Sequence, residues 1–108
     1  MNDFTLSFGS TNFSVMPSLV VISAIVSMTR SLARGLGPNV RVNAVAPGQV
    51  ATPWTETWSE ERKQIAREQA VLKRRCTAED IAEVVMFLCV SANMITGQTI
   101  ITDGGLTL

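Results

Sequence analysis

The sequence predicts an α/β fold, because helical and strand patterns alternate along the chain. Apolar residues at three- and four-residue spacing predict a helix from Val21 to Leu36. A short β-branched run at 40–45 follows, with apolar residues on both parities, as expected of a parallel strand covered on both faces. A second helix at 78–91 and a second strand at 98–102 repeat the pattern.

The N-terminal residues 1–23 are expected to form a divergent segment, poorly ordered or unrelated to the rest. Residues 1–20 carry one charge, Asp3, and no clear periodicity, and Pro17 interrupts them. The apolar stretch from Leu19 to Met28 is too short for a membrane span, which takes about 20 apolar residues. No basic residue precedes it, unlike in a secretory signal. We therefore expect no membrane insertion and a cytoplasmic location.

The first helix is expected to bury one apolar face and to end at a glycine. Gly37 supplies a C-terminal cap, and Pro38 cannot continue a helix. The strand that follows is bounded by Pro38 and Pro47. The predicted buried stripe consists of Val21, Ile25, Met28, Leu32 and Leu36.

Residues 56–83 hold thirteen of the eighteen charged side chains. Ser59 is a candidate cap for a helix running to about Val71, with Glu60 and Glu61 in its first turn. Its apolar face is thin, essentially Ile65, Ala66 and Ala70. Two interpretations stay open: a helix that faces water, or a mobile lid over a site.

Thr77 is expected to cap the next helix, with the Asp80 carboxylate at the third helical position. The helix should end near Ser91, and residues 103–105 should form a turn after the last strand. The predicted buried stripe of this helix consists of Ile81, Val84, Val85 and Leu88.

Composition excludes several classes of site. The 108 residues contain nine basic and nine acidic side chains, which argues against a nucleic-acid binder. Histidine and tyrosine are absent, which excludes Ser-His catalysis, a His-ligated zinc and a tyrosine acid. Cys76 and Cys89 lack metal-site spacing, so we assign no metal. Both are interpreted as reduced structural thiols, with Cys89 buried.

Three stretches together resemble a known family. Residues 41–48 read RVNAVAPG and lead into Val50 and Thr52, residues 95–98 read ITGQ, and residues 103–105 read DGG. In this order they closely resemble the C-terminal third of the short-chain dehydrogenase/reductase family, of the 3-oxoacyl-acyl-carrier-protein-reductase-like group. The resemblance covers residues 24–108.

The resemblance implies the C-terminal part of a doubly wound parallel-sheet domain of Rossmann type, here incomplete. It implies an oxidoreductase that binds NAD or NADP. Pro47 and Gly48 resemble the turn that lines the nicotinamide site, Val50 the residue whose main chain meets the carboxamide, and Thr52 a hydroxyl that reaches the same group. The alternative is that Pro47 and Gly48 form a simple turn and that Thr52 caps a helix.

Residues 53–75 fall where the family carries its substrate loop. Trp54 and Trp58 either pack on a substrate there or dock against the protein's own core. The second helix and last strand resemble elements that the family uses in tetramer contacts.

The catalytic motif of the family is missing. Counted back from Thr29, its lysine and tyrosine would fall at Ile22 and Ser18. No glycine-rich dinucleotide fingerprint occurs in the chain either. We therefore assign no catalytic residue and expect the chain to be inactive alone, as the product of a truncated gene, an alternative start or splice, or a frameshift.

Three function hypotheses follow. The first is an inactive remnant of an NAD(P)-dependent oxidoreductase. The second is an interaction module that forms a homo-oligomer or associates with a full-length homologous subunit, since two strands alone are marginally stable. The third is an enzyme that uses other residues, such as Asp103 or Lys73.

Overall fold

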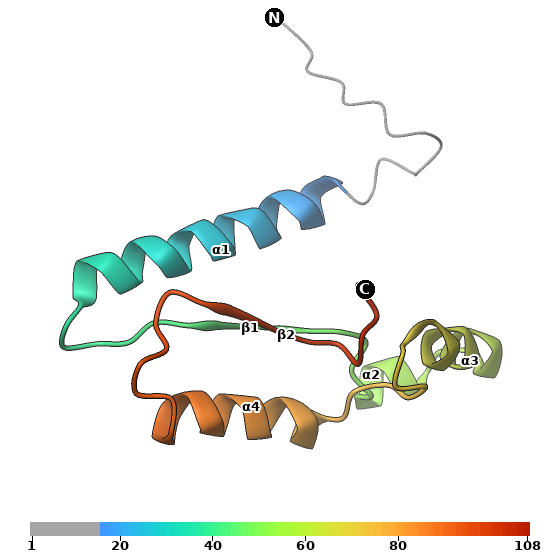
Figure 1. The fold of residues 1–108 in the computed structure, drawn as a ribbon. Helices are drawn as coiled ribbons and strands as arrows, with labels where there is room; N and C mark the ends of the chain where they lie inside the picture. The colour runs from blue at the N-terminus through green and yellow to red at the C-terminus, as the bar shows by residue number, and fades with distance from the viewer. Residues whose placement is uncertain (1–15) are drawn as a thin grey trace, which may run out of the picture.

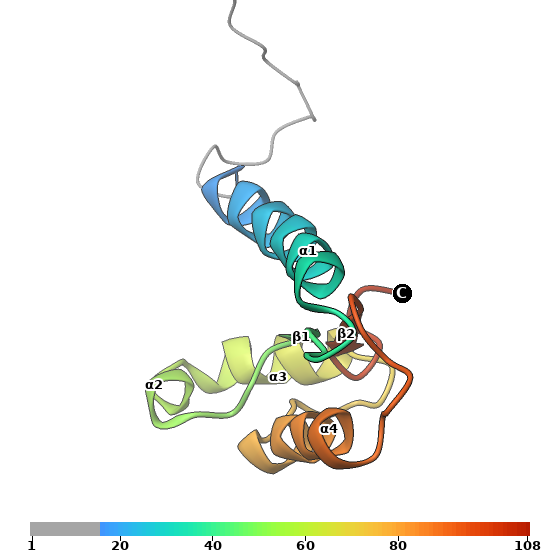
Figure 2. The same cartoon turned by 90° about the vertical axis from the view of Figure 1, so that its left-hand side faces the viewer.

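The computed structural model describes residues 16–108, and side-chain burial from Ser23 onward. α1 lies over one face of the strand pair β1–β2 and α4 over the other (Figure 1). Figure 2 shows these three layers end-on, and Figure 1 shows α2 and α3 beyond one end of the strand pair. The elements are α1 (Met16–Leu36), β1 (Ala44–Pro47), α2 (Pro53–Glu56), α3 (Glu60–Gln69), α4 (Ala78–Val90) and β2 (Thr99–Thr102).

The two strands pair in parallel, as their apolar pattern predicts. Ala44 lies opposite Thr99, and Pro47 lies opposite Thr102. Helices on both faces explain why apolar residues occupy both parities of these strands. The α/β class is confirmed.

α1 begins at Met16, earlier than the predicted start at Val21. Pro17 does not interrupt it, because a proline in the first turn lacks only an N–H that has no acceptor within the helix. The helix ends at Leu36, as Gly37 and Pro38 predict. Residues 1–15 of the expected divergent segment lie outside the described residues, as do the side chains at positions 18 and 22.

The predicted buried stripe of α1 is wrong for the described residues. The helix packs through small side chains, since Thr29 and Ala33 are buried. Small residues allow the helix to approach the sheet closely, which leaves the larger side chains on its flank. These residues are 42–56% exposed: Ile25, Met28, Leu32 and Leu36.

β1 starts at Ala44 rather than at residue 40, because Asn43 bonds through its side chain instead of the strand ladder. Its Oδ1 accepts from the Gln98 amide at 3.1 Å, and its Nδ2 donates to the Ile95 carbonyl at 2.9 Å. Arg41 donates to the Ala92 carbonyl at 2.9 Å, just beyond α4. The segment before β1 is therefore tied to the loop between α4 and β2.

α3 is capped by Ser59, as predicted, and its thin apolar face is only partly buried. Ala66 is buried and Ala70, the C-cap, is buried beside it, whereas Ile65 is 48% exposed. Lys63 is buried as well. The helix therefore faces water on most of its surface but docks through two alanines and one lysine.

α4 confirms the predicted capping box. The Thr77 Oγ1 accepts from the Asp80 amide at 3.2 Å, and the Asp80 carboxylate accepts from the Thr77 amide at 2.7 Å. Leu88 is buried, but Val85 is exposed, in contrast to its predicted burial.

The predicted burial of Cys89 is wrong. Cys89 is exposed, whereas Cys76 is buried. Cys89 lines a hollow of about 350 Å³ beside β1, together with Val45 and Val85. No other described element fills this hollow, so the flank of α4 that carries Cys89 is left open.

Candidate functional site

The candidate site lies at the carboxyl end of β1, where open α/β sheets bind ligands. The Gly48 amide donates to the Thr102 carbonyl at 3.0 Å, which extends the pairing with β2. A Cβ at position 48 would lie 2.7 Å from the Cβ of Asp103. Glycine is therefore required sterically, because the turn after β2 presses against this loop.

Asp103 holds that turn together. Its carboxylate accepts from the Gly105 amide at 2.8 Å and from the Thr107 amide and hydroxyl at 3.0 and 2.8 Å. The Thr107 hydroxyl and these amides hold the pKa of Asp103 below its ordinary value. Lys73, the other residue of the third hypothesis, donates to the Glu68 carbonyl at 2.8 Å. Both groups are thus engaged in structural hydrogen bonds.

Val50 presents a free main-chain donor. Val50 lies opposite Cys76 in a short parallel bridge, whose two hydrogen bonds are made by the neighbours of Val50. The Ala51 amide donates to the Cys76 carbonyl at 2.8 Å, and the Cys76 amide donates to the Gln49 carbonyl at 3.2 Å. The Val50 carbonyl, on the other side, accepts from the Thr55 hydroxyl at 2.9 Å. The Val50 N–H has no acceptor among the described residues.

Thr52 caps α2. Its Oγ1 accepts from the Thr55 amide at 3.3 Å, and its own amide donates to the Thr55 hydroxyl at 2.8 Å. The helix-cap interpretation of Thr52 is confirmed. A role of its hydroxyl toward a cofactor stays a prediction, as do the roles of Pro47, Gly48 and Val50.

A charge network with two buried cations, Lys63 and Arg75, and an exposed carboxylate, Glu56, lies behind this loop. The Arg75 guanidinium pairs with Glu56 at 3.0 Å, and Glu56 pairs with Lys63 at 3.1 Å. Hydrogen bonds from Lys63 and Arg75 hold the pKa of Glu56 below its ordinary value. Hydrogen bonds to Glu60 and Glu56 raise the pKa of Lys63. The network joins α2, α3 and the segment before α4.

The two tryptophans differ in their surroundings. Trp58 is half-buried, with the Arg62 guanidinium 3.9 Å from its ring centre. Trp54 meets Trp58 edge-on at 6.1 Å but is 74% exposed. Trp58 therefore packs within the protein, and Trp54 is open to contact a ligand or partner.

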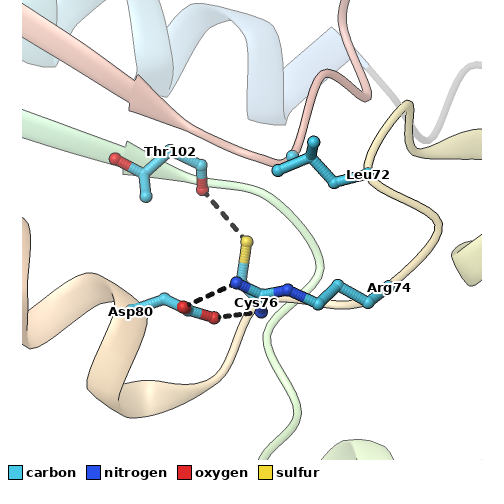
Figure 3. A pocket seen from close by; sticks show the side chains of 6 residues that line it. Leu72, Arg74, Cys76, Asp80 and Thr102 are labelled. Carbon is cyan, nitrogen blue, oxygen red and sulfur yellow. Dashed lines mark hydrogen bonds and ion pairs between the residues drawn. The ribbon is translucent and has the colours of Figure 1, made fainter.

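A small pocket of about 150 Å³ lies behind the bridge to Val50 (Figure 3). Within it the Cys76 thiol donates to the Thr102 carbonyl at 3.3 Å. Arg74 pairs with Asp80 through both guanidinium ends, Nη2 lying 2.8 Å from Oδ1. This pair and the capping bonds hold the pKa of Asp80 well below its ordinary range. The pocket is thus lined by groups that already bond to one another.

Within residues 16–108, no cluster of three potential metal-ligating side chains occurs. In the same range, no helix is long and apolar enough to cross a membrane.

Thr55 and Arg75 were not predicted as site residues. Thr52 and Thr55 are three residues apart with Pro53 between them, a pattern typical of a capped helix start. This pattern could have identified Thr55. No local pattern marks Arg75, because its partners lie 19 to 25 residues earlier in the chain.

Comparison with known proteins agrees with the resemblance. The family model described as Enoyl-(Acyl carrier protein) reductase matches residues 15–107. The 3-oxoacyl-(acyl-carrier-protein) reductase FabG of Aquifex aeolicus is 43% identical over 105 residues, which cover 95% of this chain and 40% of that protein.

Solved structures agree as well. A short-chain dehydrogenase/reductase of the glucose/ribitol type from Brucella melitensis is 42% identical, with a TM-score of 0.74 over 80% of this chain and 36% of that one. A small-chain dehydrogenase in complex with NADPH is 27% identical, with a TM-score of 0.76 over 85% of this chain and 43% of that one.

The chain spans about 40% of the length of these relatives. The matched span includes β1, both main helices and β2, in the order and parallel arrangement that a partial Rossmann-type domain requires. On this evidence the chain belongs to the short-chain dehydrogenase/reductase family.

Proposed function

We propose that this chain carries the nicotinamide end of an NAD(P) site of an oxidoreductase. The observation that carries the proposal is the free N–H of Val50, which lies between two residues whose main-chain groups are paired. A carboxamide offers an acceptor for this N–H and a donor for the Thr52 hydroxyl. Gly48 keeps the loop free of a side chain beside the sheet end. The NADPH-bound relative supports a nicotinamide cofactor.

Bound nicotinamide would supply or accept a hydride at a carbonyl carbon. This chain's residues would bind and orient the ring, but they provide no acid for the carbonyl oxygen. Ser18 and Ile22 occupy the positions of the family's tyrosine and lysine, and the chain contains no tyrosine. We therefore propose that the chain alone binds the cofactor weakly and does not turn over a substrate.

A fluorescence titration with NADH and NADPH, paired with an assay of carbonyl reduction, tests this function. We expect saturable binding without cofactor oxidation. Thr52→Val should weaken binding by about fivefold to tenfold, the value of one hydrogen bond. Thr52→Ser, which keeps the hydroxyl and the cap, should bind as the unchanged chain does. No binding of either cofactor, or turnover by the chain alone, would contradict the proposal.

A second candidate function is an interaction module, favoured by the open edge of β1. The Ala44 and Gly48 amides donate to the β2 segment, so strand alternation turns the N–H and C=O of Val45 to the opposite edge. The hollow lined by Val45, Val85 and Cys89 lies beside that edge. A second copy or a full-length homologous subunit is the proposed partner, because unpaired strand edges and apolar patches favour association.

Val45→Pro tests the interaction module. The substitution removes the outward N–H and leaves the amides that bond to β2. We expect an unchanged far-ultraviolet circular dichroism spectrum and a loss of co-elution with the partner in size-exclusion chromatography. Retained co-elution in the variant would show that β1 does not form the contact.

A further inference from the structure

Arg75 brings a charged group into the interior directly behind the loop that carries Val50. Its side chain is only 6% exposed. Nη1 donates to the Glu56 carboxylate at 3.0 Å, and Nη2 donates to the Val50 carbonyl at 3.2 Å and to the Thr55 hydroxyl. A buried charge is costly unless it is paired and hydrogen-bonded, so these partners fix the guanidinium in one place.

The Val50 carbonyl is consequently held by two donors. The Thr55 hydroxyl, itself buried, donates to it at 2.9 Å, and Arg75 supplies the second bond. On the other side of the same peptide, the Ala51 N–H donates to the Cys76 carbonyl at 2.8 Å. Because a peptide unit is planar, bonds at both ends fix its rotation.

The fixed peptide lies next to the one that carries the free N–H. Val50 has its N–H and C=O on the same edge of the extended segment, opposite the bridge to Cys76. This N–H belongs to the preceding Gln49–Val50 peptide, whose carbonyl accepts from the Cys76 amide at 3.2 Å. With that peptide held by Cys76, the donors that hold the Val50 carbonyl limit rotation about the two bonds of the Val50 Cα and so help to orient the free N–H. Arg75 reaches this edge from the segment before α4, and Glu56 links the same guanidinium to Lys63 of α3.

We propose that Arg75, together with Thr55, is a positioning residue that aims the Val50 N–H at the nicotinamide carboxamide without touching the cofactor. This inference rests on the proposed function for its ligand. Its structural half, the control of the Val50–Ala51 peptide by Arg75, is testable without any cofactor.

Arg75→Lys is the informative substitution, and Arg74→Lys is its control. Lysine keeps the charge, but one ammonium group lacks the planar fork that reaches Glu56, Thr55 and Val50 together. Arg74 is the adjacent arginine, and its side chain pairs with Asp80 outside the loop. Its bond to residue 75 goes to the main-chain carbonyl, which the substitution of Arg75 leaves in place.

Amide hydrogen exchange measured by NMR on the cofactor-free chain is the first test. In Arg75→Lys the Ala51 amide should exchange about tenfold faster, the value of a lost charged hydrogen bond. The Ala44 and Gly48 amides, which pair with the β2 segment, should keep their rates. Arg74→Lys should leave Ala51 unchanged. An unchanged Ala51 rate in a folded Arg75→Lys chain would overturn the proposal.

A second pair of variants decides the question if Arg75→Lys fails to fold. Thr55→Val removes the hydroxyl donor to the Val50 carbonyl, and Thr55→Ser restores it. Faster Ala51 exchange in the valine variant, reversed in the serine variant, supports the positioning role. Equal exchange in both variants overturns it.

Cofactor titration completes the test. Arg75→Lys should bind NADH or NADPH about tenfold more weakly than Arg74→Lys does. Equal affinity of the two variants would overturn the positioning role. If the unchanged chain binds neither cofactor, the proposed function fails, and the exchange rates alone decide whether Arg75 controls the Val50 peptide.

Discussion

At the scale of single residues, Gly48 has the most restricted environment at the candidate site. The Cβ and Cα of Asp103 lie 2.7 and 2.8 Å from where a side chain would begin. The Cα and Cβ atoms of Asp103 cannot move aside as the end of a flexible side chain would. Gly48 is thus fixed by packing, whatever it contributes to cofactor binding.

Gly48→Ala should lower the free energy of unfolding by about 1–3 kcal/mol, the usual cost of overpacking. Gly35→Ala is the matched control, because nothing lies within 4 Å of a Cβ at that helical position. The control should be neutral or stabilising by up to about 1 kcal/mol. Urea unfolding of both variants measures the difference, and equal effects would show that the loop can yield at Gly48.

The Asp80 carboxylate should make part of the folding stability depend on pH in the acid range. Its pKa in the folded chain lies below the ordinary value of 3.8, mainly because of Arg74 and the Thr77 amide. A carboxyl with a depressed pKa stabilises the fold above its unfolded pKa, and this contribution disappears as pH falls through the folded pKa. Asp80→Asn should therefore show a shallower loss of stability on acidification. Parallel urea titrations across the acid range would refute this if their slopes coincide.

At the scale of elements, the caps and the buried faces differ in how far the sequence predicts them. The Thr77–Asp80 capping box and the Ser59 cap depend on residues three apart, so a local pattern suffices. Burial of the α1 stripe depends on what lies beside the helix, and α1 docks through Thr29 and Ala33 instead. The bonds of Arg75 to the Val50 loop are long-range and left no local signal.

The α1 stripe predicts self-association through an exposed face. Met28 and Leu32 are 56% and 42% exposed. Replacing both with glutamine should change the stability of the monomer little and should reduce association at high concentration, since apolar patches drive it. Sedimentation velocity measures the effect. Ser27→Gln, at an exposed polar position of the same helix, is the control.

At the scale of the whole molecule, the described part of the chain buries few apolar side chains. Within the described residues, no large side chain is fully buried. The sheet of these residues has two strands. Two-stranded sheets are marginally stable in water without further packing. We expect a thermal midpoint that rises with protein concentration, because association stabilises only the folded state. A sharp, concentration-independent transition in a demonstrated monomer would contradict this.

The proposed nicotinamide end and the absent glycine-rich fingerprint together predict which half of the cofactor this chain recognises. Reduced nicotinamide mononucleotide should shift the amide resonances of Val50 and its neighbours, as NADH does. ADP-ribose, which lacks the nicotinamide, should leave them unchanged. The most direct measurement is therefore a pair of NMR titrations of the full chain. The predicted result is that the mononucleotide shifts the Val50 resonance and ADP-ribose does not. Equal shifts with ADP-ribose, or no shift with either compound, would contradict the account.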